Sequence, residues 1–266
     1  MPDKFILLSS AVAIATIKSA TGFVMNYRLL LGILATICIC ASIPSRAAAG
    51  DVEICDGQGL SGRIAACSRL IKSGSLPERR LSRTYNNRGM GYLMLGEVDR
   101  GISDFDKAIQ FDADFEMPYF NRGYAHVFKM RLDQAEGDFA NAMKAKPNWE
   151  APYIGRAVVW FLRGSSDDAI ADLTSAIAIN PNSAEAYVNR GVVYRVNGQI
   201  AEAISDFKMA LKIDPSNEDA QFQINELSIN PGPIMRHPAS SGSPANIGVK
   251  LSKLHGGQMV QCILCR

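Results

Sequence analysis

The sequence predicts an all-α protein, a right-handed solenoid of stacked helical hairpins with a capping helix at each end. The first observation behind this prediction is an aromatic residue that returns every 34 residues, as Tyr85, Tyr119, Tyr153 and Tyr187. The second is a pair of charges with the same period, an arginine three residues after each tyrosine and an aspartate 16 residues after each arginine. A constant period of this length indicates one supersecondary unit repeated in tandem.

Four repeat units follow one another over residues 82–217, with boundaries at 82–115, 116–149, 150–183 and 184–217. In most units, small residues stand at positions 8, 20 and 27 and large residues at positions 4, 11 and 24, as in Gly123, Ala135, Ala142, Tyr119, His126 and Phe139 of the second. This pattern resembles the tetratricopeptide repeat. The resemblance implies a helix-turn-helix unit whose small residues let its two helices approach closely.

Each repeat unit also carries signals for where its helices end. Gly96, Gly164 and Gly198 follow the first helix of three units, where a left-handed residue is favoured. The second unit has Met130 at this place, so we expect its hairpin to be the least regular. Proline at position 32 of the last three units ends the second helix. Arginine at position 7 and aspartate at position 23 predict an ion pair between the two helices, repeated in every unit.

A solenoid needs a cap at each end. Residues 218–229 are amphipathic and predict a C-terminal capping helix with a polar outer side. Upstream, residues 50–81 predict an N-terminal cap, in which a degenerate half-repeat over 53–76 lacks a first helix of its own. In this half-repeat Cys67 stands where Phe105 stands in the first full unit.

The segment 1–49 predicts export. A short charged start from Met25, an apolar run over residues 29–41 and the small residues that end at Ala49 are typical of a signal peptide, cleaved after Ala49. The true start is then Met25, and the alternative is an uncleaved membrane anchor. Export places the protein in the periplasm or outside the cell, as in the short exported tetratricopeptide proteins of Gram-negative bacteria that it resembles.

Export also changes how the cysteines are interpreted. In an oxidising compartment, Cys55 and Cys67 are expected to form a disulfide that ties down the N-terminal cap. The alternative is that Cys67 is a small buried apolar residue. The tail 230–266 is rich in Pro, Ser and Gly and predicts disorder. Its Cys262 and Cys265 have neither the setting of a redox site nor enough nearby ligands for a zinc site.

Nothing in the sequence predicts catalysis, a cofactor or a metal. The chain has only three histidines, and His126 falls at a core position of its repeat. No phosphate-binding glycine loop and no small-molecule site are evident. The formal net charge of +2, without a basic stripe, argues against nucleic acid as a partner. The predicted partner is therefore a protein or peptide, with membrane contact only through an uncleaved N-terminal segment.

The family resemblance implies that the first helices line a concave binding face. Position 6 is similar to the asparagine ladder of the O-linked N-acetylglucosamine transferase superhelix, with Gly155 interrupting it. The candidate peptide-binding residues combine these amides with an apolar strip: Asn87, Asn121, Asn189, Phe120, Tyr124, Val127, Phe128, Ile154, Val158 and Phe161. An amide both donates and accepts, which suits an extended peptide backbone. The alternative is that these apolar side chains are buried within the superhelix itself.

The predicted function is a non-catalytic interaction scaffold or adaptor of the cell envelope. Two rival functions are a self-associating structural scaffold, which would be a homo-oligomer, and an accessory subunit of an envelope enzyme or secretion complex. A third, an enzyme that uses the tail cysteines, would lose its activity on truncation at Pro231.

Overall fold

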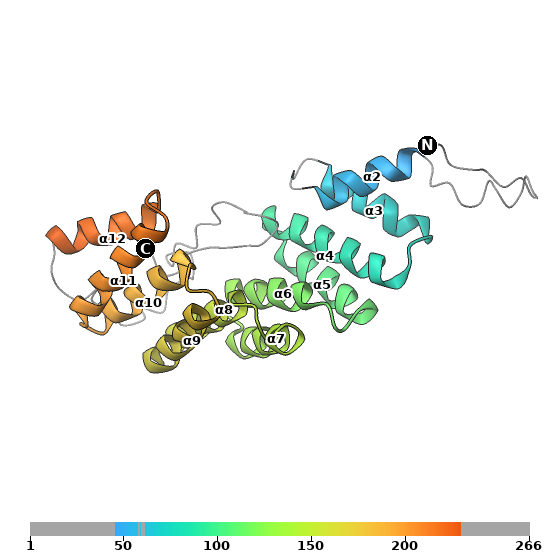
Figure 1. Ribbon diagram of the computed structural model, residues 1–266. Coiled ribbons are helices and arrows are strands. Elements are labelled where there is room, and N and C mark those ends of the chain that lie inside the picture. Colours follow the sequence, from blue (N-terminus) through green and yellow to red (C-terminus); the bar gives the residue numbers. More distant parts are fainter. Residues whose placement is uncertain (1–45, 58, 60–61, 230–266) are drawn as a thin grey trace, which may run out of the picture. The chain divides into compact units, whose positions relative to one another are not determined.

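The computed structural model describes residues 46–57, 59 and 62–229, and every described helix lies in the second of two compact units, residues 46–266 (Figure 1). Within the described residues there are 11 α-helices and no strand. The helices are α2 (Arg46–Asp56), α3 (Arg63–Ser73), α4 (Glu78–Met94), α5 (Val98–Phe111), α6 (Glu116–Phe128), α7 (Leu132–Ala145), α8 (Ala151–Arg163), α9 (Ser166–Ile179), α10 (Ala184–Val196), α11 (Ile200–Ile213) and α12 (Glu218–Ile229). Residues 1–45 of the predicted signal segment and the predicted tail, 230–266, lie outside the described residues.

Helices α4 to α11 form four consecutive hairpins, one in each repeat unit. In every hairpin the first helix packs on the second, and the second helix packs on the first helix of the next hairpin (Figure 1). The first helices α4, α6, α8 and α10 also contact one another in order. This arrangement confirms the predicted all-α solenoid.

Small and large residues interlock inside each hairpin as the repeat pattern predicts. Phe105, Phe139 and Phe207 are fully buried, and their rings press against backbone of the first helices. A Cβ added to Gly191 would lie 2.6 Å from Cε1 of Phe207, closer than real Cβ contacts come. Position 8 therefore has to stay small, because the ring occupies the space that a side chain would need.

The turn between the two helices of each hairpin uses a left-handed residue. Gly96, Gly164 and Gly198 have φ values of 77°, 85° and 80°, as predicted. In the second hairpin Met130 takes this place, with φ of 56°. A residue with a Cβ is strained in this conformation, at a cost on the order of 1 kcal/mol or more.

The N-terminal cap is a pair of helices, α2 and α3, which corrects the prediction of a half-repeat without a first helix (Figure 1). Val52 and Cys55 give α2 an apolar side that packs on α3. The predicted cleavage after Ala49 falls within α2, so the mature chain would keep its part from Gly50 to Asp56.

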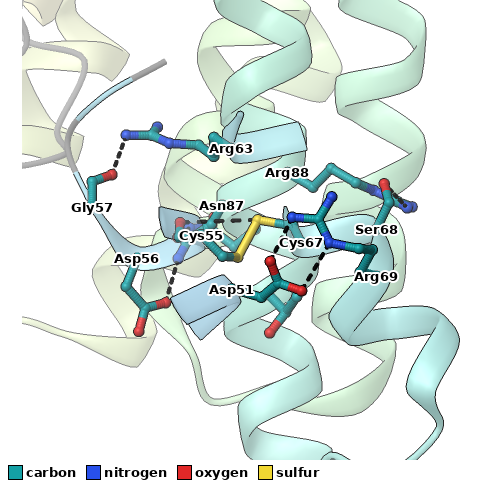
Figure 2. Close-up of a disulfide and its surroundings, with 12 residues drawn as sticks. Asp51, Cys55, Asp56, Gly57, Arg63, Cys67, Ser68, Arg69, Asn87 and Arg88 are labelled. Carbon is teal, nitrogen blue, oxygen red and sulfur yellow. Dashed lines mark hydrogen bonds and ion pairs between the residues drawn. A yellow bond between two sulfur atoms is a disulfide. The ribbon is translucent and has the colours of Figure 1, made fainter. Parts of the chain in front are cut away.

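The structure joins Cys55 of α2 to Cys67 of α3 by a disulfide, with the two Cα atoms 5.0 Å apart (Figure 2). Both residues are buried. Arg69 donates to Asp51 at 2.8 and 2.5 Å, and Asp56 accepts from Arg80 of α4 at 2.5 Å. The Arg69–Asp51 pair therefore joins the two helices of the cap, and the Arg80–Asp56 pair attaches the cap to the first full repeat.

Replacing both Cys55 and Cys67 by serine is expected to lower the stability of the cap by about 3 kcal/mol or less, because the loop that the bridge closes is short. Hydrogen exchange should then speed up in α2 and α3 and stay unchanged in α10 and α11. Alkylation of both Cys55 and Cys67 as free thiols in the native exported protein, located by peptide mass spectrometry, would contradict the disulfide.

The C-terminal helix α12 packs on α10 and α11 through Ala220, Gln223 and Leu227. The predicted helix is present, but its outer side is not wholly polar. Phe222 is 51% exposed and Ile229 is 72% exposed. These residues stand at positions 5 and 12 of a first helix, and among the described residues no further first helix follows to cover them.

Candidate interaction site

A bidentate ion pair between arginine and aspartate recurs in all four hairpins, which confirms the prediction from positions 7 and 23. The four pairs are Arg88–Asp104, Arg122–Asp138, Arg156–Asp172 and Arg190–Asp206, each with two N–H donors 2.7–2.9 Å from the carboxylate oxygens. All four aspartates are buried, and all four arginine side chains are partly buried. Hydrogen bonds to the aspartates raise the pKa of Arg88, Arg156 and Arg190.

Three of these arginines also reach back to the preceding helix pair. Arg88 donates to Ser68 at 3.1 Å, and Arg190 donates to Thr174 at 3.1 Å. Arg122 donates to Asp106 at 2.5 Å. The residue at the corresponding place before the third hairpin is Ala140, which has no acceptor in its side chain. Each such arginine links three helices. It therefore stabilises both its own hairpin and the contact between that hairpin and the preceding helix pair.

His126 is a packing residue, as its repeat position predicts. It is buried, with Nε2 3.8 Å from Oδ2 of Asp138, and its Nδ1 has no partner in the described structure. Burial lowers the pKa of His126, because the charged imidazolium would lose water. It also raises the pKa of Asp138, against the opposing effect of Arg122. The imidazole is therefore neutral at pH 7.

Because the folded pKa of His126 lies below its unfolded value, this residue contributes stability above about pH 6.5 that is lost as the pH falls. His126→Tyr, which installs the residue of the first and fourth repeats at this position, is expected to remove part of the loss of stability between pH 7 and pH 5. Urea unfolding of both proteins across that range measures the difference. An equal pH dependence of the two proteins would contradict this role.

The asparagine side chains predicted to form a ladder do not form a continuous row exposed to solvent. Asn121 and Asn189 are fully buried, and Asn121 donates to Oδ1 of Asn86 at 2.9 Å. Asn87 donates to Asp56 of the cap at 3.1 Å. A Cβ at Gly155 would lie 2.5 Å from Cε1 of Phe139, so that ring occupies the place of the missing amide. Oδ1 of Asn121 and both amide atoms of Asn189 have no hydrogen-bond partner among the described residues, and peptide binding by this row stays a prediction.

Most of the predicted apolar strip is also buried, which favours the alternative that these side chains are covered within the superhelix. Five of its residues are at most 6% exposed: Phe120, Tyr124, Val127, Ile154 and Val158. The rings of Phe120 and Trp149 lie 4.6 Å apart, and burial raises the pKa of Tyr124 well above its usual value. The strip is buried because successive first helices stack closely and cover one another. Phe161 is half-buried, and Phe128 is the strip's exposed member.

Three large apolar side chains are exposed at the turns of the first two hairpins, and we call them the turn patch: Leu95, Phe128 and Met130. They are 54%, 50% and 43% exposed, respectively. Lys129 lies between the last two and bonds both carboxylate oxygens of Asp99, at 2.6 and 2.7 Å. Since Asp99 begins the second helix of the first hairpin, this ion pair holds the two turns side by side. From the sequence, Met130 was predicted only to make the second hairpin the least regular one.

Met130→Gly is expected to stabilise the second hairpin by about 1 kcal/mol, because glycine accepts the left-handed conformation without strain. The other three hairpins already have glycine there. Urea unfolding monitored by circular dichroism measures the change. Gly96→Met should produce the opposite shift in the first hairpin, and a destabilising effect of Met130→Gly would contradict the argument.

The described part of the chain contains no cluster of three or more His, Cys, Asp or Glu side chains placed to hold a metal ion. Among its helices, none is both long and apolar enough to cross a membrane.

Comparison with known proteins agrees with this geometry. Two family models match, one for the tetratricopeptide repeat over residues 184–217 and one for the TPR repeat over residues 159–195. Residues 159–217 thus match tetratricopeptide repeats. No curated protein matches its sequence.

Solved structures of TPR proteins share the fold. The thermophilic TPR protein TTC0263 of Thermus thermophilus is 19% identical, with a TM-score of 0.55 over 64% of this chain and 91% of that chain. MamA is 24% identical, with a TM-score of 0.51 over 59% of this chain and 89% of that chain. At identities this low, the likeness shows the fold alone.

Proposed function

We propose that this TPR protein is a non-catalytic interaction scaffold of the cell envelope that binds a protein or peptide. Stacked repeats of this family present extended surfaces for binding. The observation that carries the proposal is the turn patch. A natural chain can avoid the strain at Met130 with glycine, as it does in three hairpins, yet here it keeps a side chain that is exposed to solvent.

The turn patch suits an apolar protein segment. Leu95, Phe128 and Met130 give it three flexible or aromatic apolar side chains, and methionine adapts its shape to a partner. The exposed Arg131 follows directly in sequence. We therefore expect the bound segment to carry an apolar anchor and a nearby acidic residue. The proposed binding surface then lies at the turns of the first two hairpins. It adjoins the predicted concave face, because Phe128 belongs to both.

Export to the envelope supports the proposal from the sequence side. A chain whose signal segment ends at Ala49 would fold with α2 and α3 in an oxidising compartment, where Cys55 and Cys67 pair. The N-terminus of the protein recovered from its producing cells, read by mass spectrometry, should be Gly50. An N-terminus at Met25 or earlier would favour the uncleaved anchor.

Affinity capture from the envelope fraction tests the proposal. Wild type is compared with Leu95→Ser/Phe128→Ser/Met130→Gly, and with the control Asn141→Ala/Ser175→Ala, which changes exposed residues of α7 and α9. We expect wild type and control to retain the same protein and the turn-patch variant to lose at least nine-tenths of it. Equal capture by all three would remove the turn patch as the site. If each protein captured only copies of itself, the self-associating scaffold would replace the proposal.

A further inference from the structure

The end of the solenoid at α12 exposes a face that the earlier first helices bury. At position 5, Asn86, Phe120, Ile154 and Val188 are at most 5% exposed, whereas Phe222 is 51% exposed. At position 12, Leu93, Val127 and Arg195 are at most 6% exposed and Phe161 is half-buried, whereas Ile229 is 72% exposed. Each earlier face is covered by the first helix that follows it, as the bond from Arg195 on α10 to Gln223 on α12 illustrates (2.8 Å).

The exposed face of α12 is therefore shaped to receive an apolar helical segment. Phe222 and Ile229 are seven residues apart and lie on one side of the helix. Acidic residues flank them, with Glu218 one turn before Phe222 and Glu226 one turn after it. An occupant that fits this face needs apolar residues at helical spacing and basic residues beside them.

One segment of the chain has this chemistry. Ile247, Leu251 and Leu254 have the spacing of one helical face, and Lys250 and Lys253 lie beside them in sequence. Residues 230–266 carry four basic residues and no acidic one, whereas residues 46–229 carry 21 basic and 25 acidic ones. The charges of the two parts are thus complementary.

The connection is also long enough. Seventeen residues separate Ile229 from Ile247, and a chain of that length spans up to about 55 Å when extended. Helix α12 itself is about 18 Å long, from its 12 residues. We propose that residues 247–254 of the same chain cover the exposed face of α12 and so complete the end of the solenoid. This inference is independent of what the turn patch binds.

Hydrogen exchange of the full chain tests the inference. A chain ending at Ala245 is expected to exchange its α12 amides at least tenfold faster than the full chain, with no change in α6 to α9. Lys250→Glu/Lys253→Glu should give part of this acceleration, because it removes the attraction to Glu218 and Glu226 without shortening the chain. Equal exchange of α12 in all three proteins would overturn the proposal.

Zero-length cross-linking then identifies which copy supplies the segment. We expect carbodiimide links from Lys250 or Lys253 to Glu218 or Glu226, and expect Phe222→Asp/Ile229→Asp to abolish them. In a mixture of ordinary and ¹⁵N-labelled chains, the links should join residues of one isotope only. Mixed links, accompanied by a doubled molar mass, would replace the proposal with an exchange between two copies.

Discussion

Gly155→Ala is expected to lower the free energy of unfolding of the central hairpins by about 3 kcal/mol, at the upper end of the usual cost of overpacking. The new Cβ would lie 2.5 Å from Cε1 and 2.6 Å from Cζ of Phe139. That ring cannot easily move, because it is fully buried and its centroid lies 5.2 Å from that of Tyr124 and 6.1 Å from that of Phe120. Urea unfolding of wild type and variant measures the loss.

Two companion variants make this prediction specific. Gly137→Ala changes a glycine of α7 whose added Cβ meets nothing within 4 Å, so it should stabilise the helix by up to about 1 kcal/mol. Phe139→Leu installs the residue type of Leu173 in the third hairpin, and it should recover most of the stability that Gly155→Ala loses. If both glycine variants had the same effect, the close approach of Phe139 would not be the reason for Gly155.

Arg122→Ala is expected to destabilise the solenoid by about 3 kcal/mol, because it leaves the buried carboxylate of Asp138 without its partner. The guanidinium donates to Asp138 at 2.9 and 2.7 Å and to Asp106 at 2.5 Å. The loss of stability should extend to the first and second hairpins, since Arg122 also donates to the second helix of the preceding hairpin. Hydrogen exchange should therefore accelerate in α5 as well as in α6 and α7.

A double-mutant cycle isolates the pair itself. Arg122→Ala, Asp138→Ala and the double variant should show a coupling of about 2 kcal/mol, which is typical of a partly buried bidentate charge pair. The matched cycle on Arg69 and Asp51 concerns a pair whose arginine is 58% exposed, and its coupling should be clearly smaller because solvent screens the charges. A coupling of zero for Arg122 and Asp138 would mean that their recurrence in every repeat has no energetic basis.

The fold was predictable from the sequence because each hairpin is specified locally. The 34-residue period, the small residue opposite each buried ring and the left-handed glycines all act within one unit or between neighbours. The same holds for the ion pair of Arg122 and Asp138, whose partners lie 16 residues apart. Helix α2 was missed because only Val52 and Cys55 mark its apolar side.

The candidate site was less predictable because exposure depends on how closely successive hairpins stack. Apolar residues such as Phe120 and Ile154 give the same sequence pattern whether the neighbouring first helix buries them or leaves them exposed to solvent. The contact of Phe139 with Gly155, where the row of asparagines is interrupted, likewise depends on the distance between neighbouring hairpins. The sequence does contain one signal for the turn patch, because Met130 replaces the glycine that the other three repeats have at this turn.

Site-specific photo-cross-linking in the producing cell tests the interaction surface most directly. A photoreactive phenylalanine analogue is placed at Phe128 in the turn patch, and in a second protein at Ser175, an exposed residue of α9. We predict an adduct with one other protein at position 128 and none at position 175. An adduct at position 175 with none at position 128 would contradict the proposed surface, and adducts only between copies of this chain would contradict the scaffold function.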